Sequence, residues 1–164
     1  MSTLNFDFAS QPAVSSVALK VLRDSALFSS LDDTELQAVA RCVVDVSVPT
    51  GGVVIHEGAT GENLYLIRSG LLKVEKDADG RRLLLGELGP GSAFGEMSLI
   101  HAAPTSATVT AVDESRLLAI GRLDLDVLLN WNPILASKMW RSFTQLLATR
   151  LRDMNERMVD KFGA

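Results

Sequence analysis

Residues 94–109 read Phe94-Gly95-Glu96-Met97-Ser98-Leu99-Ile100-His101-Ala102-Ala103-Pro104-Thr105-Ser106-Ala107-Thr108-Val109. Gly95 follows a glycine-rich approach, and the pattern predicts a short helical turn that begins at Glu96. The start of a helix leaves backbone N–H groups unpaired and carries a partial positive charge, so it can receive an anion such as a phosphate. Glu96, at the rim, could accept hydrogen bonds from a sugar hydroxyl. The alternative is a β-turn with a structural glycine and a solvated glutamate.

The whole stretch resembles the phosphate-binding cassette of the cyclic nucleotide-binding domain family, which includes the catabolite activator protein and the regulatory subunits of cyclic-nucleotide-dependent kinases. The family pattern is Phe-Gly-Glu, two residues, Leu, a short spacer, Pro-Arg, one residue and Ala-Thr-Val. Thr105 stands where the family has arginine. The chain matches the pattern without a gap at Phe94, Gly95, Glu96, Leu99, Pro104, Ala107, Thr108 and Val109. Residues 94–109 are called the cassette below.

The resemblance implies a role for each cassette residue. Gly95, Glu96, Met97 and Ser98 would line the phosphate and the ribose, with Glu96 on the ribose hydroxyl. The cyclic phosphate would face Thr105, Ser106 and Ala107. Apolar surface for the base would come from Leu83 and Leu85, which alternate on a predicted strand.

Composition limits the class of protein. With 164 residues and 47% hydrophobic content, the chain suits a single globular unit. A net charge of -4 and a pI near 5.1 argue against a nucleic-acid partner. The lone cysteine, Cys42, predicts a buried and inert thiol. No signal peptide or membrane-spanning run is apparent, so we expect a cytoplasmic protein with no membrane partner.

The first part of the chain predicts a tail and two helices. Residues 1–12 are polar, with Phe6 and Phe8 embedded, and either lack order or dock elsewhere. Residues 13–42 carry apolar side chains at helical spacing, and Asp32 with Glu35 forms a capping-box pattern.

Residues 43–121 read as a β unit. Apolar and polar residues alternate from Val43, and ten of the 12 glycines lie between residues 51 and 95. Asp79-Gly80 is a hairpin signal. The resemblance extends over this unit, so we predict an antiparallel jelly-roll β-barrel, in a mainly β fold with flanking helices.

Residues 122–164 return to helical spacing, and Pro133 suits the first turn of a long final helix. Its apolar stripe has two interpretations. The helix packs only on its own barrel, or it also forms a homodimer with the same helix of a second copy. In the family that the chain resembles, the corresponding helix often covers the ligand and pairs with its twin. The stripe consists of Trp140, Phe143, Leu147, Leu151, Met154 and Met158.

The first alternative to a binding module is an enzyme. A metal-dependent barrel enzyme needs several histidines, and the chain has only His56 and His101. We therefore expect neither catalytic residues nor a metal or other cofactor.

The leading hypothesis is a non-catalytic regulatory sensor that binds a cyclic nucleotide, with cAMP favoured, and signals through its last helix. The missing arginine weakens the site by roughly 1.5–3 kcal/mol, unless Arg81, Arg82 or Arg150 reaches in. The alternative is a domain that has lost its nucleotide and serves as an interaction or dimerisation module, or one that binds another nucleotide such as a cyclic dinucleotide. The sequence does not separate cAMP from cGMP, name a protein partner or say whether further segments flank the chain.

Overall fold

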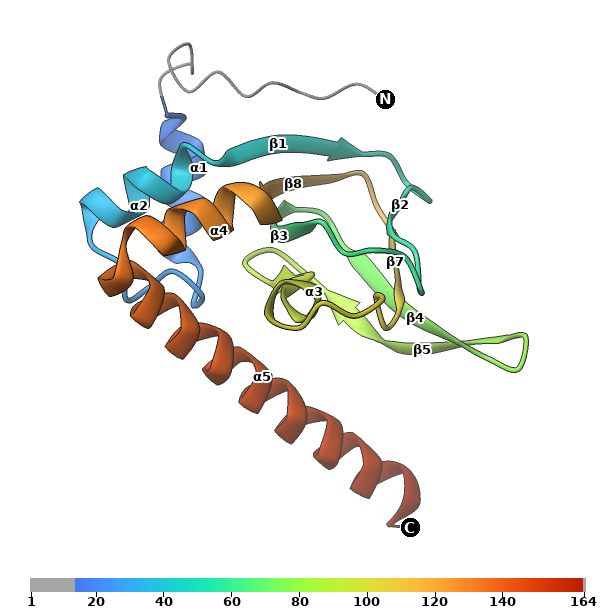
Figure 1. Ribbon diagram of the computed structural model, residues 1–164. Helices are drawn as coiled ribbons and strands as arrows, with labels where there is room; N and C mark the ends of the chain where they lie inside the picture. Colours follow the sequence, from blue (N-terminus) through green and yellow to red (C-terminus); the bar gives the residue numbers. More distant parts are fainter. Residues whose placement is uncertain (1–13, 164) are drawn as a thin grey trace.

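The structure, a computed structural model, describes residues 14–163. The predicted tail at residues 1–12 lies outside the described residues. Figure 1 shows two sheets, a group of short helices at one end of them, and one long helix that runs from this group to the C-terminus.

The two predicted N-terminal helices are present. Helix α1 spans Ser16–Asp24 and α2 spans Asp33–Ala40. The capping box is confirmed, because the Asp32 carboxylate accepts from the Glu35 N–H at 2.8 Å and the Glu35 carboxylate accepts from the Asp32 N–H at 2.8 Å.

The β unit consists of two four-stranded antiparallel sheets. One has the order β1-β8-β3-β6 and the other the order β2-β7-β4-β5. The mainly β fold with flanking helices is confirmed, but the predicted closed barrel is wrong, since these sheets remain separate. The chain passes from one sheet to the other through turns, such as the one around Gly51 between β1 and β2. These turns interrupt the hydrogen-bonded pairing of strands. The strands are β1 Val43–Val48, β2 Val53–Ile55, β3 Asn63–Ser69, β4 Leu72–Ala78, β5 Arg81–Leu88, β6 Ala93–Phe94, β7 Thr108–Ala111 and β8 Ser115–Gly121.

The first sheet lies between two hydrophobic cores, because successive side chains along β3 and β8 point to opposite faces. Leu64 and Leu66 on β3 point into a core shared with the helices, whereas Ile67 belongs to a second core, which also contains Leu72 and Val109 of the other sheet. The layers are therefore helices, first sheet and second sheet.

The remaining helices begin where the sequence predicts. Helix α3 spans Glu96–Ile100, α4 spans Arg122–Trp131 and α5 spans Pro133–Phe162, with Pro133 in the first turn. The hairpin between β4 and β5 turns at Asp79 and Gly80, with φ values of 54° and 79°.

Helix α5 has a buried half and an exposed half. Leu135, Met139 and Phe143 are buried in the core that also contains residues of α1, α2 and α4. Lys138 Nζ also donates to the buried carboxylate of Glu35 on α2 at 2.7 Å. Beyond Arg150 the apolar side chains of Leu151, Met154 and Met158 are more than half exposed.

Cys42 is half-buried rather than fully buried. Burial, and then the negative charge of Asp124, raises the pKa of its thiol to about 11, so the thiol stays protonated and unreactive at neutral pH. Among the described helices, none is both long and apolar enough to cross a membrane.

Candidate ligand-binding site

Gly95 positions the start of the cassette. It caps α3 with φ of 87°, a left-handed conformation that favours glycine. A Cβ atom at this position would lie 2.5 Å from the Asn63 carbonyl oxygen on β3. Both constraints require glycine, and together they bring the backbone before Glu96 directly against β3.

Glu96 is almost completely buried, with 1% of its surface exposed. Its Oε1 atom accepts a hydrogen bond from Nη1 of Arg150 on α5, and Arg150 Nη2 donates to the Ala93 carbonyl oxygen on β6. The other carboxylate oxygen, Oε2, is buried and has no hydrogen-bond partner within residues 14–163. The predicted solvated glutamate is therefore excluded, and one acceptor is left over.

The Thr105 hydroxyl is engaged within the chain. It lies within hydrogen-bond distance of the His56 and Ala59 carbonyl oxygens and accepts from the Ala59 N–H at 3.0 Å. Backbone bonds from Gly58 N to Thr105 O and from Thr105 N to Ala59 O reinforce the contact, at 2.8 and 2.9 Å. Thr105 thus fastens the loop at residues 56–59 to the end of the cassette.

The other predicted site residues surround this pair. Ser98 is buried beside Gly61, Ser106 is exposed and Ala107 is buried. Met97 on α3 is 55% exposed. Leu83 and Leu85 on β5 are each nearly half exposed, and Leu84 between them is 59% exposed. The second sheet therefore presents an apolar strand surface that no described segment fully covers.

The structure separates the three arginines that the sequence left unplaced. Arg150 contacts the cassette through Glu96. Arg81 pairs with Ala78 at the tip of the β4–β5 hairpin, and Arg82 forms a 3.9 Å ion pair with Glu75. Another α5 residue, Arg157, donates to the Leu85 carbonyl oxygen at 2.7 Å. Helix α5 is thus attached at both β5 and the cassette.

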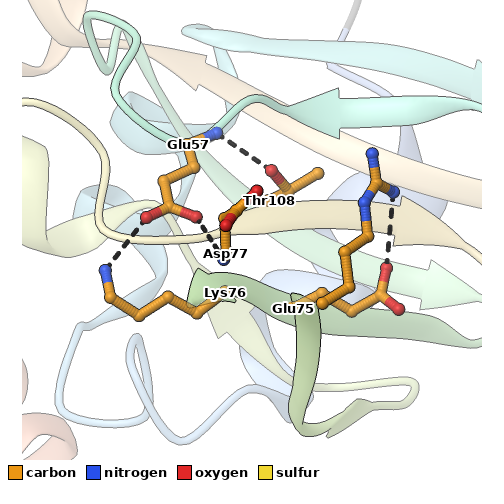
Figure 2. A pocket seen from close by; sticks show the side chains of 6 residues that line it. Glu57, Glu75, Lys76, Asp77 and Thr108 are labelled. Carbon is orange, nitrogen blue, oxygen red and sulfur yellow. Dashed lines mark hydrogen bonds and ion pairs between the residues drawn. The ribbon is translucent and has the colours of Figure 1, made fainter. Parts of the chain in front are cut away.

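A charged pocket of about 250 Å³ lies beside the end of the cassette and is lined by Glu57 and by residues of β4, β5 and β7 (Figure 2). Glu57 accepts from the Asp77 N–H at 2.8 Å and from Lys76 Nζ at 3.1 Å. The backbone bond from Asp77, followed by the bond from Lys76, lowers the pKa of the Glu57 carboxyl. The lining charges are largely paired with one another. Among residues 14–163, no cluster of three metal-ligating side chains occurs.

Comparison with known proteins agrees with this geometry. The sequence model described as "Cyclic nucleotide-binding domain" matches residues 45–132, more than half of the chain. The chain belongs to this family. Its matched region contains the cassette, α4 and both sheets except for the first two residues of β1.

Named relatives are regulators and regulatory subunits. The chain is 31% identical over 145 residues to a CRP-like cAMP-activated global transcriptional regulator from Mycobacterium tuberculosis, covering 86% of this chain and 62% of that protein. It is 32% identical over 129 residues to a cAMP-dependent protein kinase regulatory subunit from Aspergillus niger, covering 73% of this chain and 31% of the relative. The chain therefore spans about a third to two thirds of these relatives.

Solved structures show the same fold. A cyclic nucleotide-binding domain from Methylobacillus flagellatus superposes with a TM-score of 0.79 at 27% identity, covering 88% of this chain and 82% of that one. The family, and the mainly β fold with flanking helices, are thus established. The chain is thus a domain of the cyclic nucleotide-binding family, similar to parts of a CRP-like regulator and of a kinase regulatory subunit.

Proposed function

We propose that the domain binds a cyclic nucleotide, cAMP in particular, between the cassette, β5 and α5, and that binding changes the position of α5. The observation that carries the proposal is the buried Glu96 carboxylate at the start of α3, one oxygen of which has no hydrogen-bond partner among residues 14–163. A buried acceptor without a donor is costly, and a ligand hydroxyl would satisfy it.

Each predicted site residue has a place in this scheme. The ribose hydroxyl donates to Glu96 Oε2, and Gly95 allows the sugar and phosphate close to the backbone. Backbone groups from Glu96 to Ser98 and from Thr105 to Ala107 lie around the phosphate. Leu83, Leu85 and Met97 supply exposed apolar surface for the base. Nothing in the scheme breaks a bond, so we propose a cytoplasmic sensor that is not an enzyme and needs no cofactor.

A second function is favoured by Thr105. The cassette has no arginine, and the Thr105 hydroxyl is already bonded to the loop at residues 56–59. In a domain that had lost its nucleotide, the cassette would remain as a structural element, and the exposed part of α5 would carry the function as an interaction surface.

Thr105→Arg separates the two functions. If the site binds a cyclic nucleotide, the added guanidinium should pair with the phosphate and tighten binding about tenfold or more. The melting temperature without ligand should fall slightly, because the hydroxyl bonds to the loop are lost. Calorimetric titration with cAMP and cGMP measures the first effect and a thermal melt the second.

Thr105→Val is the matched control, since it removes the hydroxyl and adds no charge. It should reproduce the loss of stability without tighter binding. Absence of binding in both the wild type and Thr105→Arg, with both proteins folded, would favour the interaction module instead.

We also propose that the exposed half of α5 pairs with α5 of a second copy. Leu151, Met154 and Met158 recur at steps of three and four along it and are all exposed. Leu151→Asp should convert a dimer into a monomer in light scattering, because it places a charge in the seam. Thr149→Asp, on the opposite helix face, should leave the dimer intact. A wild type that is monomeric at high concentration would contradict the pairing.

A further inference from the structure

The cassette supplies no positive charge of its own to bind an anionic ligand. Glu96 and His101 are its only ionisable residues, so at neutral pH the cassette itself carries one negative charge and no compensating cation. Because Glu96 is buried, a phosphate brought close to its carboxylate would meet repulsion that water screens poorly. A phosphate site here therefore needs a cation from outside the cassette.

Two cationic side chains of the described region contact the cassette. Lys76 Nζ donates to the Ser106 carbonyl oxygen at 2.8 Å, but it also pairs with Glu57 in the charged pocket (Figure 2). Arg150 reaches the cassette from α5 and contacts Glu96 itself. Arg150 is thus the cation beside the carboxylate that needs neutralising.

We infer that Arg150 supplies the positive charge that this cassette lacks and serves the ligand phosphate in place of the family's cassette arginine. The inference rests on the proposed function and names the residue through which it acts. A guanidinium has five N–H donors, and the structure engages Arg150 with two acceptors, Glu96 Oε1 and the Ala93 carbonyl oxygen. Its side chain is still 34% exposed, so further donors are open to an anion.

This placement couples occupancy of the site to α5. In the family pattern the arginine lies within the cassette, whereas here the charge comes from Arg150 on the long helix, 54 positions after Glu96. A phosphate held by Arg150 is therefore held only while α5 lies on the cassette, and the bound ligand in turn keeps α5 in place.

The test compares an anionic and a neutral ligand. The affinities for cAMP and for adenosine, which lacks the phosphate, are measured by calorimetry for the wild type and for Arg150→Gln. We expect Arg150→Gln to weaken cAMP binding about tenfold to a hundredfold and to change adenosine binding by less than about threefold. An equal loss for both ligands, or no loss for cAMP, would overturn the inference, because Arg150 would then act only through the fold or not at all.

Two further variants sharpen the result. Lys76→Gln, which removes the other cation at the cassette, should leave the ratio of the two affinities unchanged; a selective loss of cAMP binding here would move the role to Lys76. Thr105→Arg in the Arg150→Gln background should restore the higher affinity for cAMP than for adenosine. If it does not, the two arginines do not serve the same phosphate site. Should Arg150→Gln not fold, Arg150→Lys keeps the charge and should keep the preference for cAMP, whereas loss of that preference would contradict the inference.

Failure of the proposed function looks different. In that case the wild type and Thr105→Arg bind neither ligand, although a thermal melt shows that both are folded. If instead the wild type binds cAMP and Arg150→Gln binds it equally well, the function stands and the role of Arg150 falls.

Discussion

Arg150→Met should lower the free energy of unfolding of the ligand-free domain by about 3 kcal/mol. Removing one partner of a buried ion pair typically costs about 3–5 kcal/mol, because the remaining charge stays buried. The lower end applies here, since Glu96 is 1% exposed but water reaches about a third of the Arg150 side chain. Urea unfolding followed by circular dichroism measures the change.

The partner variant tests the cause. Adding Glu96→Gln to Arg150→Met removes the stranded charge and should recover most of the lost stability, because a neutral pair in place of an ion pair is nearly free of cost. Arg157→Met is the matched control, since Arg157 also lies on α5 but donates to a backbone carbonyl oxygen. It should cost no more than about 1 kcal/mol. A loss as large as that of Arg150→Met, or no recovery in the double variant, would show that the Glu96–Arg150 pair does not determine the stability.

Gly95→Ala should destabilise the domain by about 3–4 kcal/mol and abolish nucleotide binding. A side chain at φ of 87° costs about 1–2 kcal/mol, and the new Cβ would also lie 2.5 Å from the Asn63 carbonyl oxygen, which adds an overpacking cost of about 1–3 kcal/mol. Relief of this contact must move the turn that carries Glu96. Unfolding and cAMP titration give the two effects.

Gly91→Ala is the control for the backbone term. Gly91 has φ of 84°, but an added Cβ would meet no atom within 4 Å. It should therefore cost only the conformational strain, about 1–2 kcal/mol, and leave nucleotide binding intact. Equal costs at Gly91 and Gly95 would mean that the close approach to β3 has no energetic weight.

The parts of the fold that depend on neighbours in sequence could be predicted. Asp32 and Glu35 form the capping box, Asp79 and Gly80 form the hairpin turn, and Pro133 begins α5. Each of these needs only a few consecutive residues and a known backbone conformation. The cassette was predictable for the same reason, since its residues match the family pattern without a gap.

The parts that depend on distant contacts could not be predicted. Nothing in the sequence indicates that Arg150 rather than Arg82 reaches Glu96, because the pair is 54 residues apart and depends on how α5 packs. The Thr105 hydroxyl appeared free to face a phosphate, but it bonds to a loop 46 residues earlier. Alternation along the strands likewise predicts β structure without deciding whether two sheets close into a barrel.

The most direct test of the account is a calorimetric titration of the wild-type domain with cAMP. The account predicts saturable binding at one site per chain, held by Glu96 and Arg150. A folded wild-type protein that releases or absorbs no heat of binding with millimolar cAMP, and whose melting temperature cAMP leaves unchanged, would contradict it.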